Sequence, residues 1–374
     1  MSVRGASGMR PRHGPQSGGE GFRLLLVRIA PLGDVLVTTP AIRCVRAALP
    51  AARIEFLTGE GGAELLEGNV HLDEILLWRP GLRAELALAR ELRRRRYDAV
   101  VDFECAWPTA RLVLATGARL RIGSHRPGPR RFCYNRRVRR PRPPASIARE
   151  RLELLRPLGI EPEAMPDLSL ELAIRPEDHA WAERVIRDLA LGGDAPIVAV
   201  SPVSRLPYKQ WGADRWAAVA DRLAGAGAQV LLTNGPGERE QVAAVVGHMR
   251  HRAAWDYGPS SLRQLAALYR RCVLWVGNDG GAMHLAVAAG TPTIGVFRWA
   301  TRARWSHPEP RGRHAGIDRA PPQGCDQQCT RCVHLGCLRA VSVEEVVETA
   351  LSKLAAIRSG VAASESTNRH DLPV

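Results

Sequence analysis

The sequence predicts two α/β domains of doubly wound, Rossmann-like type with a cleft between them. Three observations support this prediction. Short apolar runs alternate with segments of helical spacing, the alternation restarts after residues 175–195, and a length of 374 residues suffices for two domains. Alternating strands and helices are typical of parallel sheets covered by helices on both faces.

The first half opens with RLLLVRI (23–29), a continuous apolar run like those of buried parallel strands. Further strands are expected at 53–58, 74–78 and 98–103. Helical spacing follows the first strand, recurs around 63–66, and separates the third strand from the fourth. A basic loop then leads to a helix in ASIARERLELLRPLGI.

The second half repeats this pattern. Strands are expected at 196–202, 229–234, 273–278 and 292–297, and helices at 214–227, 237–249, 261–272 and 281–290. The chain contains no GxGxxG turn, which argues against a dinucleotide-dependent oxidoreductase. The predicted organisation is a disordered tail (1–21), a first domain (22–180), a second domain (181–342), a helix (343–358) and a disordered tail (359–374).

Positive charge is concentrated in one segment of this chain, whose net charge is +15. Ten arginines and no acid lie between Arg119 and Arg142. Such a segment could bind nucleic acid, an anionic membrane surface or a phosphorylated substrate, or it could be an arginine-rich loop with no ligand. Aromatic residues are sparse there, which argues against a surface that stacks bases.

The sequence also bears on location. No run of about 18 apolar residues predicts a membrane-spanning helix, and the first 21 residues lack the apolar core of a secretion signal. We therefore expect a cytoplasmic protein.

Three turns after predicted strands carry candidate functional residues, because ligands of parallel sheets bind beyond the carboxyl ends of the strands. Asp34 follows the first strand, where it would act as a general base or cap the next helix. Ser204, Arg205 and Lys209 follow the strand at 196–202. Asp279, Gly280, Gly281 and His284 lie in GNDGGAMH, whose glycines expose backbone N–H groups to an anion.

Lys209 is one of two lysines in a chain with 51 arginines. A compact ammonium can follow charge that moves between phosphate oxygens, which a planar guanidinium does less well. The alternative is that Lys209 is an ordinary surface residue. For His284 the alternative is a histidine that only packs against its neighbours.

Taken in order, these segments resemble the family 9 glycosyltransferases, the ADP-heptose:lipopolysaccharide heptosyltransferases. The similarity runs from about Arg23 to Leu354 and rests on LLVRIAPLGDVLVTTP, SPVSRLPYKQW, NGPGERE, VGNDGGAMHLAVAAGTPTIGVF and CTRCVHLGCLRAVSVEEVVETAL. The resemblance implies a GT-B fold in which the first domain binds the acceptor and the second binds the nucleotide sugar. It also implies that the helix at 343–358 packs back on the first domain.

The resemblance assigns roles to the residues. Asp34 corresponds to the catalytic base of an inverting transfer, and Lys209, Ser204 and Arg205 to residues at the donor diphosphate. Glu238 corresponds to the acid at the nucleoside. The donor-binding turn corresponds to four residues: Asp279, Gly280, Gly281 and His284. The implied transfer is metal-independent and needs no cofactor.

The chain departs from the family pattern at three positions. Arg205 replaces a small hydroxyl residue, Gly280 stands where Ser or Thr is usual, and Arg298 stands where Gly is common. Since both arginines would reshape the donor pocket, another nucleotide sugar is an alternative to ADP-heptose.

Four cysteines, Cys325, Cys329, Cys332 and Cys337, have the spacing C-x3-C-x2-C-x4-C. Four thiolates this close could hold a structural zinc ion or an iron–sulfur cluster, but the motif alone does not establish either.

The leading functional hypothesis is a glycosyltransferase that moves a heptose-like sugar from a nucleotide-diphosphate donor to a lipopolysaccharide-core or similar glycan. Its expected partners are the nucleotide sugar, an anionic glycolipid acceptor and the inner face of the cytoplasmic membrane, with no nucleic acid. The alternatives are a family 9 relative with another donor and acceptor, and a non-catalytic protein that binds anions or RNA on this scaffold.

Overall fold

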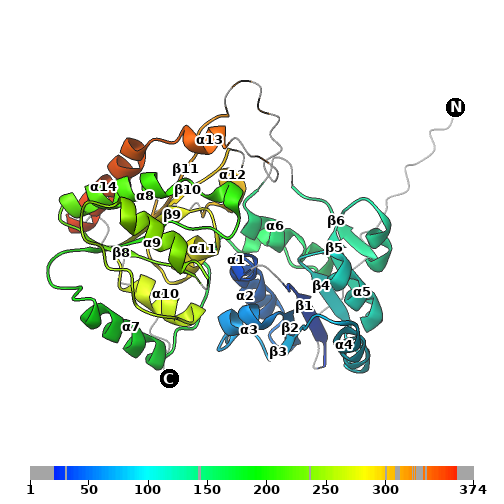
Figure 1. Cartoon of the computed structure of the whole chain (residues 1–374). Coiled ribbons are helices and arrows are strands. Elements are labelled where there is room, and N and C mark those ends of the chain that lie inside the picture. The colour runs from blue at the N-terminus through cyan, green and yellow to red at the C-terminus, as the bar shows by residue number, and fades with distance from the viewer. Residues whose placement is uncertain are drawn as a thin grey trace.

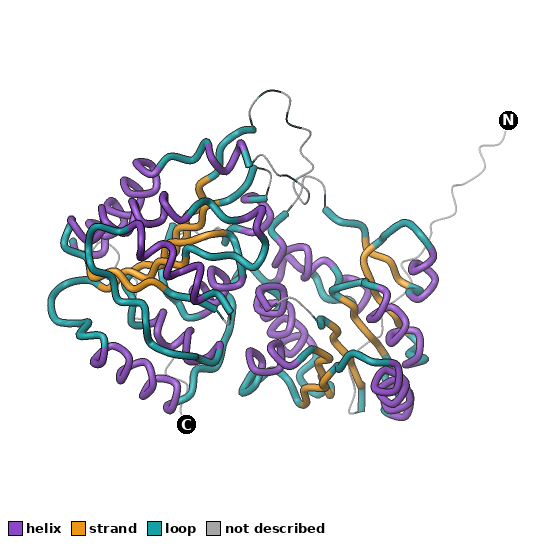
Figure 2. The backbone as a smooth tube through the Cα atoms, viewed as in Figure 1, coloured by secondary structure: helices purple, strands orange, loops and turns teal. Residues whose placement is uncertain are grey.

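Two parallel β-sheets, one in each half of the chain, form the framework of the computed structural model (Figure 1). The structure describes residues 21–29, 32–141, 145–235, 237–299, 301–307, 312–321, 323, 325, 332 and 335–359. The two predicted tails therefore lie outside the described residues, apart from Gly21 and Ser359. Figure 2 shows the strands in two separate groups, each surrounded by helices, which confirms the prediction of two α/β domains.

The first domain holds six parallel strands in the order β3-β2-β1-β4-β5-β6. This arrangement is the strand order of the Rossmann fold. The strands are β1 (Arg23–Val27), β2 (Arg53–Thr58), β3 (Glu74–Leu77), β4 (Ala99–Asp102), β5 (Leu120–Ser124) and β6 (Arg136–Val138). The helices are α1 (Leu32–Leu36), α2 (Thr39–Ala48), α3 (Glu60–Leu66), α4 (Leu82–Arg94), α5 (Trp107–Thr116), α6 (Ile147–Glu153) and three 3₁₀ turns, η1 (Pro129–Cys133), η2 (Arg156–Leu158) and η3 (Pro162–Ala164).

The second domain holds five parallel strands in the order β8-β7-β9-β10-β11. The strands are β7 (Ile197–Ser201), β8 (Gln229–Leu232), β9 (Leu274–Asn278), β10 (Thr293–Val296) and β11 (His314–Ile317). The helices are α7 (Pro176–Asp188), α8 (Ala213–Gly225), α9 (Arg239–His248), α10 (Leu262–Arg270), α11 (Gly281–Ala288), α12 (Arg302–Trp305), α13 (Gly336–Arg339), α14 (Val343–Arg358) and the 3₁₀ turn η4 (Pro207–Lys209). A parallel bridge between Leu231 and Ala254 continues this sheet beyond β8. With that bridge counted as an outer strand, the two sheets share one strand order.

Both faces of each sheet are covered by helices. In the first domain, α2 and α6 pack on the face that contains Leu24 and Leu26, and α4 and α5 pack on the face that contains Leu25 and Val27. Because both faces of β1 are buried, its continuous apolar sequence is what a central parallel strand requires.

The two domains share an apolar core. The cluster formed by α7, α10 and α11 on one face of the second sheet also includes Leu36, Val37 and Leu65 of the first domain. These side chains are almost fully buried. We call this region, where α1 and α3 meet α10 and α11, the domain junction.

The position of α14 corrects an expectation. The helix does not pack back on the first domain, because Val346, Val347, Ala350 and Leu354 are buried with α8 in the core of the second domain. That core covers the face of the second sheet opposite the junction. The predicted boundary at 180/181 is also wrong, because it falls inside α7, which packs on α10 and belongs to the second domain.

The basic segment is more ordered than the sequence indicated. The region from Arg119 to Arg142 is not a single loop, because it contains β5, η1 and β6. The guanidinium of Arg121 donates to the carbonyl oxygens of Ala118 (2.7 Å) and Cys133 (3.0 Å), so an arginine in β5 is satisfied by backbone acceptors. The strand β11 was not predicted either.

No helix in the described part of the chain is long and apolar enough to cross a membrane.

A buried carboxylate organises the amino-terminal edge of the first sheet. The Glu55 side chain, with no exposed surface, pairs with Arg23 (3.0 Å), Arg53 (2.6 Å) and Arg95 (2.9 Å), and it accepts a hydrogen bond from Tyr97. Burial raises the pKa of Glu55, but the Tyr97 and arginine contacts outweigh it and leave the pKa below its ordinary value. The ionised carboxylate therefore stabilises the fold above about pH 4.5, and this contribution is lost as the pH falls further.

We predict that Glu55→Gln lowers the free energy of unfolding by about 3–5 kcal/mol, because three arginines then lack their shared carboxylate. Urea denaturation at pH 7 measures the loss. The matched control is Glu91→Gln, since Glu91 pairs with Arg95 at the exposed surface and should cost less than about 1 kcal/mol. Equal losses for the two variants would contradict this account of Glu55.

Candidate active site at the domain junction

The predicted site residues follow the carboxyl ends of strands in both sheets. Asp34 lies in α1 after β1, and Lys209 lies in η4 after β7. Asp279 follows β9 directly, and Glu238 lies between β8 and α9. The parallel order of each sheet places these ends at one edge, as expected for a ligand site of this architecture.

Lys209 forms an ion pair with Asp279. The Nζ atom of Lys209 lies 2.8 Å from Oδ2 of Asp279, and the Asp279 side chain is only 2% exposed. The Lys209 ammonium also lies 5.9 Å from the ring centroid of Trp305. These contacts are those of a partly buried, oriented ammonium, so the interpretation of Lys209 as an ordinary surface residue is wrong.

The side chain of Asn278 fixes the loop that carries Lys209. Its Nδ2 atom donates to the carbonyl oxygen of Pro202 (2.6 Å), and its Oδ1 atom accepts from the backbone N–H of Trp211 (3.2 Å). Within the loop, Gln210 donates to the carbonyl oxygen of Ser204 (2.7 Å). Both ends of the loop are thus tied to the last residue of β9, directly before Asp279.

His284 is buried and paired with a second histidine. Its Nδ1 atom lies 2.7 Å from Nε2 of His307, and the rings are nearly perpendicular. Burial, and secondarily the Lys209 ammonium, lower the pKa of His284 to about 3. The pKa of His307 is also lowered by burial and by His284. Both imidazoles are therefore neutral at pH 7, and their hydrogen bond fixes the orientation of the His284 ring.

The other edge of the His284 ring faces the first domain. A Cβ atom placed on Gly33 would lie 2.4 Å from Cδ2 of His284, which is closer than real atoms approach. Only glycine therefore allows α1 and α11 to lie this close. Since Asp34 is the next residue, this contact brings the first-domain carboxylate to the edge of the turn that carries Asp279 and Gly280.

Two buried arginines hold one oxygen of Asp34. Oδ1 lies 2.7 Å from Nη2 of Arg28 and 3.1 Å from Nη2 of Arg151. Among the described residues, no hydrogen bond is made to Oδ2 of Asp34. Asp34 is the third residue of α1, so it is not the N-terminal cap of that helix, which was the alternative role that the sequence allowed. The two arginines therefore orient the carboxylate through Oδ1.

A second carboxylate supports this arrangement. Both Arg28 and Arg151 donate to the carbonyl oxygen of Phe103. The turn at this residue is held by Asp102, which accepts from the backbone N–H groups of Glu104 (2.8 Å) and Cys105 (2.9 Å). Asp102 is therefore linked to Asp34 through one turn and two guanidinium groups.

An ion pair also crosses between the domains. Nη2 of Arg304 lies 2.8 Å from Oε2 of Glu150, next to Arg151 in α6. Arg28, Arg151, Arg304 and His307 were all missed as site residues by sequence reasoning. Arg151 did carry a signal, because it lies on the apolar side of its helix with Ile147 and Leu152.

The other predicted site residues make no hydrogen bond or ion pair with Asp34, Lys209 or Asp279 in the described part of the chain. Arg205 is exposed and makes no hydrogen bond or ion pair with the described residues. Glu238 accepts from the backbone N–H of Gly235 (2.7 Å) and shapes its own turn. Gly280 and Gly281 lie at the start of α11, and a Cβ on Gly280 would meet the Ser204 hydroxyl at 3.7 Å, an ordinary contact. Arg298 is buried and stacks over the Tyr208 ring at 4.7 Å.

The cysteine motif is only partly described. Cys329 lies outside the described residues, whereas Cys332 accepts a hydrogen bond from the backbone N–H of Leu335 (3.4 Å). Within the ranges that the structure describes, no three His, Cys, Asp or Glu side chains are placed to hold a metal ion.

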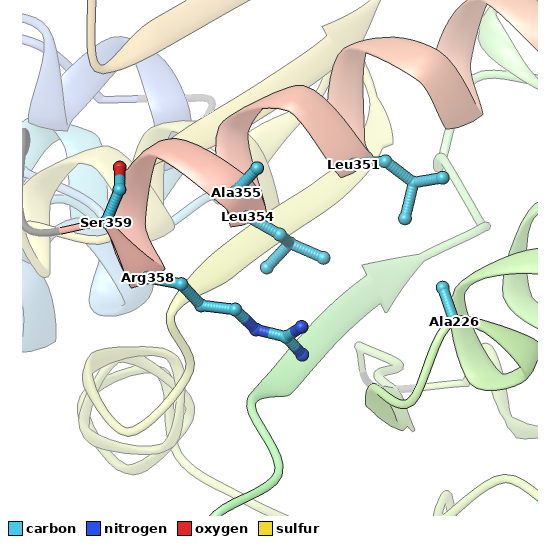
Figure 3. Close-up of a pocket in the computed structure, with 6 residues that line it drawn as sticks. All are labelled: Ala226, Leu351, Leu354, Ala355, Arg358 and Ser359. Carbon is cyan, nitrogen blue, oxygen red and sulfur yellow. The ribbon is translucent and has the colours of Figure 1, made fainter.

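A surface hollow elsewhere does not belong to this site. Figure 3 shows it between the end of α14 and the turn after α8, lined by Leu351, Leu354, Ala355, Arg358, Ser359 and Ala226. Ala226 precedes β8, so the hollow lies at the amino-terminal edge of the second sheet, away from Lys209 and Asp279.

The chain is similar to known glycosyltransferases in sequence and in structure. The family described as "Glycosyltransferase family 9 (heptosyltransferase)" matches residues 85–336. Lipopolysaccharide heptosyltransferase 3 of Escherichia coli K12 is 28% identical over 289 residues, which cover 73% of this chain and 81% of the relative. Lipopolysaccharide core heptosyltransferase OpsX of Haemophilus influenzae is 25% identical over 282 residues, covering 74% and 79% of the two chains.

Solved structures share the fold. A family 9 glycosyltransferase from Veillonella parvula superimposes with a TM-score of 0.76 at 22% identity, over 90% of this chain and 98% of that one. E. coli heptosyltransferase WaaC with ADP-2-deoxy-2-fluoro heptose gives a TM-score of 0.64 at 20% identity, over 88% and 99%. The two facing Rossmann-like domains thus define a glycosyltransferase of the GT-B fold.

Within that class, the matched family identifies the chain more closely. The chain belongs to glycosyltransferase family 9.

The buried histidine predicts a pH dependence of stability. In the unfolded chain His284 takes up a proton near its ordinary pKa of about 6.5, whereas in the folded chain it does so only near 3. Stability therefore falls as the pH drops below about 6.5, by at most about 1.4 kcal/mol per pH unit for this group. The variant His284→Asn should lose less stability between pH 7 and 5 than the parent protein, measured by urea denaturation. Parallel stability curves for the two proteins would contradict the prediction, and the difference at pH 8 reports only lost contacts.

Proposed function

We propose that this chain is an inverting heptosyltransferase that moves a heptose-like sugar from ADP-heptose to a lipopolysaccharide-core or similar surface glycan. The relatives that carry lipopolysaccharide heptosyltransferase names support the choice of sugar and acceptor. The observation that carries the proposal is the meeting of Gly33 and His284. This contact places a first-domain carboxylate at the edge of the turn that holds the Lys209–Asp279 pair.

The second domain would bind the donor diphosphate. Lys209 supplies an ammonium that is already oriented by Asp279, and Ser204 offers a hydroxyl. The backbone N–H groups of Gly280 and Gly281 begin α11, and a helix start favours an anion. In this proposal these groups balance the negative charge that grows on the departing nucleoside diphosphate, without a metal ion. Glu238 would meet the nucleoside.

The first domain would bind and activate the acceptor. Oδ2 of Asp34 takes the proton of an acceptor hydroxyl while that oxygen forms a bond to the anomeric carbon. The bond between the anomeric carbon and the phosphate oxygen breaks on the opposite side, so the configuration inverts. Arg28 and Arg151 act as positioning residues, because they orient the carboxylate through Oδ1.

The acceptor side also implies a location. A lipopolysaccharide core under assembly is an anionic glycolipid, so we propose that the enzyme works as a cytoplasmic protein at the inner face of the cytoplasmic membrane. No nucleic acid partner is expected. Donor binding and donor hydrolysis, measured across a panel of nucleotide sugars, test the identity of the donor directly, and tighter binding of another nucleotide sugar than of ADP-heptose would replace the proposed donor.

We predict that Asp34→Asn lowers the transfer rate by roughly 10²–10⁴-fold, the usual contribution of a general base. Donor affinity, measured by calorimetry, should stay near that of the parent protein. The matched control is Asp73→Asn, since Asp73 is also paired with an arginine (2.6 Å) but lies at the amino-terminal edge of the same sheet. Near-full turnover in Asp34→Asn would leave Asp34 only a structural role between its two arginines.

We predict that Lys209→Arg keeps the fold but recovers only part of the activity. The variant retains the charge beside Asp279, whereas the planar guanidinium cannot reproduce the ammonium geometry. The expected loss in transition-state stabilisation is about 1–3 kcal/mol in kcat/KM. Lys209→Ala should lose donor affinity and turnover together. Full activity in Lys209→Arg would show that the lysine has no special role.

A further inference from the structure

The exposed apolar side chains of this protein lie almost entirely in its first domain. Nine large apolar residues are exposed in the described part of the chain, and eight of them belong to that domain. They are Leu32, Val70, Leu77, Leu82, Leu86, Trp107, Leu114 and Phe132, with Trp299 alone in the second domain. Scattered exposed apolar residues need no explanation, but this asymmetry indicates a surface with a partner.

Four of these residues follow strands at the carboxyl-terminal edge of the first sheet. Leu82 and Leu86 occupy the first two turns of α4, which follows β3, and Trp107 begins α5, which follows β4. Phe132 lies in η1, which follows β5. Because the strands are parallel, these positions share the sheet edge from which Asp34 emerges. We call this set the apolar rim.

Arginines lie beside the aromatic residues of the rim, and an ion pair joins its two helices. The Arg130 guanidinium lies 5.9 Å from the Trp107 ring, which joins η1 to α5, and Arg131 lies 4.8 Å from the Phe132 ring. Glu85, in the first turn of α4, is paired with Arg111 of α5 at 3.0 Å. From residue 105 to residue 149 the sequence has twelve arginines and no acidic residue.

This composition matches an anionic membrane surface. Burial of aromatic and leucine side chains at the headgroup boundary lowers the free energy of the system. Arginines beside them are attracted to anionic lipids. Leucines do not stack on bases, so the rim fits RNA less well. Figure 1 shows α4 and α5 on the side of the first domain that faces away from the second domain, so the second domain does not cover them.

We infer that the apolar rim, with Arg130 and Arg131, inserts into an anionic leaflet and seats the first domain on the membrane beside a lipid-linked acceptor. The inference deepens the proposed function and rests on it for the lipid-linked acceptor and for the role of Asp34. Docking at the edge that bears Asp34 would present sugars at the membrane surface to the catalytic carboxylate, while the second domain stays in contact with soluble donor.

The test uses the full chain and vesicles of phosphatidylcholine, either pure or with 30% phosphatidylglycerol. The parent protein should float with the anionic vesicles and be released as salt rises. Phe132→Ser and Leu82→Ser should each lower the partition coefficient between vesicles and water by about tenfold. Each variant loses the favourable transfer of a large apolar side chain from water into the membrane. The matched control is Val70→Ser, since Val70 and Phe132 are both 71% exposed but Val70 lies before β3 at the opposite edge of the sheet. It should change binding less than about twofold.

Charge is tested separately. Arg130→Gln and Arg131→Gln should each weaken binding to anionic vesicles by about fivefold, the usual effect of one basic residue at such a surface. Arg270→Gln, at an exposed position of the second domain, should have no effect. Rim variants that bind vesicles as tightly as the parent protein would overturn the inference. RNA binding that is stronger than vesicle binding and is lost in the same variants would also overturn it.

A water-soluble, deacylated acceptor separates this inference from the proposed function. The rim variants should keep their transfer rate to the deacylated acceptor and lose at least fivefold with the acylated acceptor in vesicles. If the parent protein transfers sugar to the deacylated acceptor but ignores vesicles, the docking inference fails and the proposed function stands. If the protein transfers no sugar but binds vesicles through the rim, the proposed function fails and the docking surface stands.

Discussion

The contact between Gly33 and His284 is the constraint on which the rest of the site depends. Any side chain at position 33 would collide with the imidazole, so α1 and α11 could not lie side by side. Their approach lets Leu36 and Val37 enter the core formed by α10 and α11. The same approach sets the distance between the Asp34 carboxylate and the turn after β9. The absence of a side chain at Gly33 is therefore required both for the packing of the two domains and for the geometry of the site.

The two edges of the first sheet use buried charge in different ways. At the amino-terminal edge, Glu55 is surrounded by arginines and a tyrosine, and its contacts serve stability. At the carboxyl-terminal edge, Asp34 is held by two arginines through a single oxygen. Both oxygens of Glu55 accept from side chains, whereas the arginine contacts of Asp34 are all to Oδ1 among the described residues.

Much of the fold was predictable from sequence because both sheets are parallel and buried on both faces. Continuous apolar runs located β1 and β7 within two residues of their observed ends. The strands β5, β6 and β11 were missed, because a few residues that include arginine or histidine lack such a run. For α14 the amphipathic pattern indicated a helix correctly, but periodicity cannot say which domain the apolar stripe faces.

The candidate site was predictable only in its loops. Asp34, Lys209 and Asp279 were found because turns after buried strands collect at one edge of a sheet. The contact of Arg151 with Asp34 and that of His307 with His284 were not found, because the partners lie 117 and 23 residues apart in the chain. Such contacts depend on tertiary packing, which no local pattern records.

The location of α14 has a consequence for biosynthesis. Since this helix completes the second domain and does not return to the first, the described chain passes between the domains once, before α7. Each domain is a continuous stretch of sequence, so the first can fold while the second is still on the ribosome. Until then Leu36, Val37 and Leu65 have no partner surface, and the nascent first domain carries an apolar patch that only the later half of its own chain can cover.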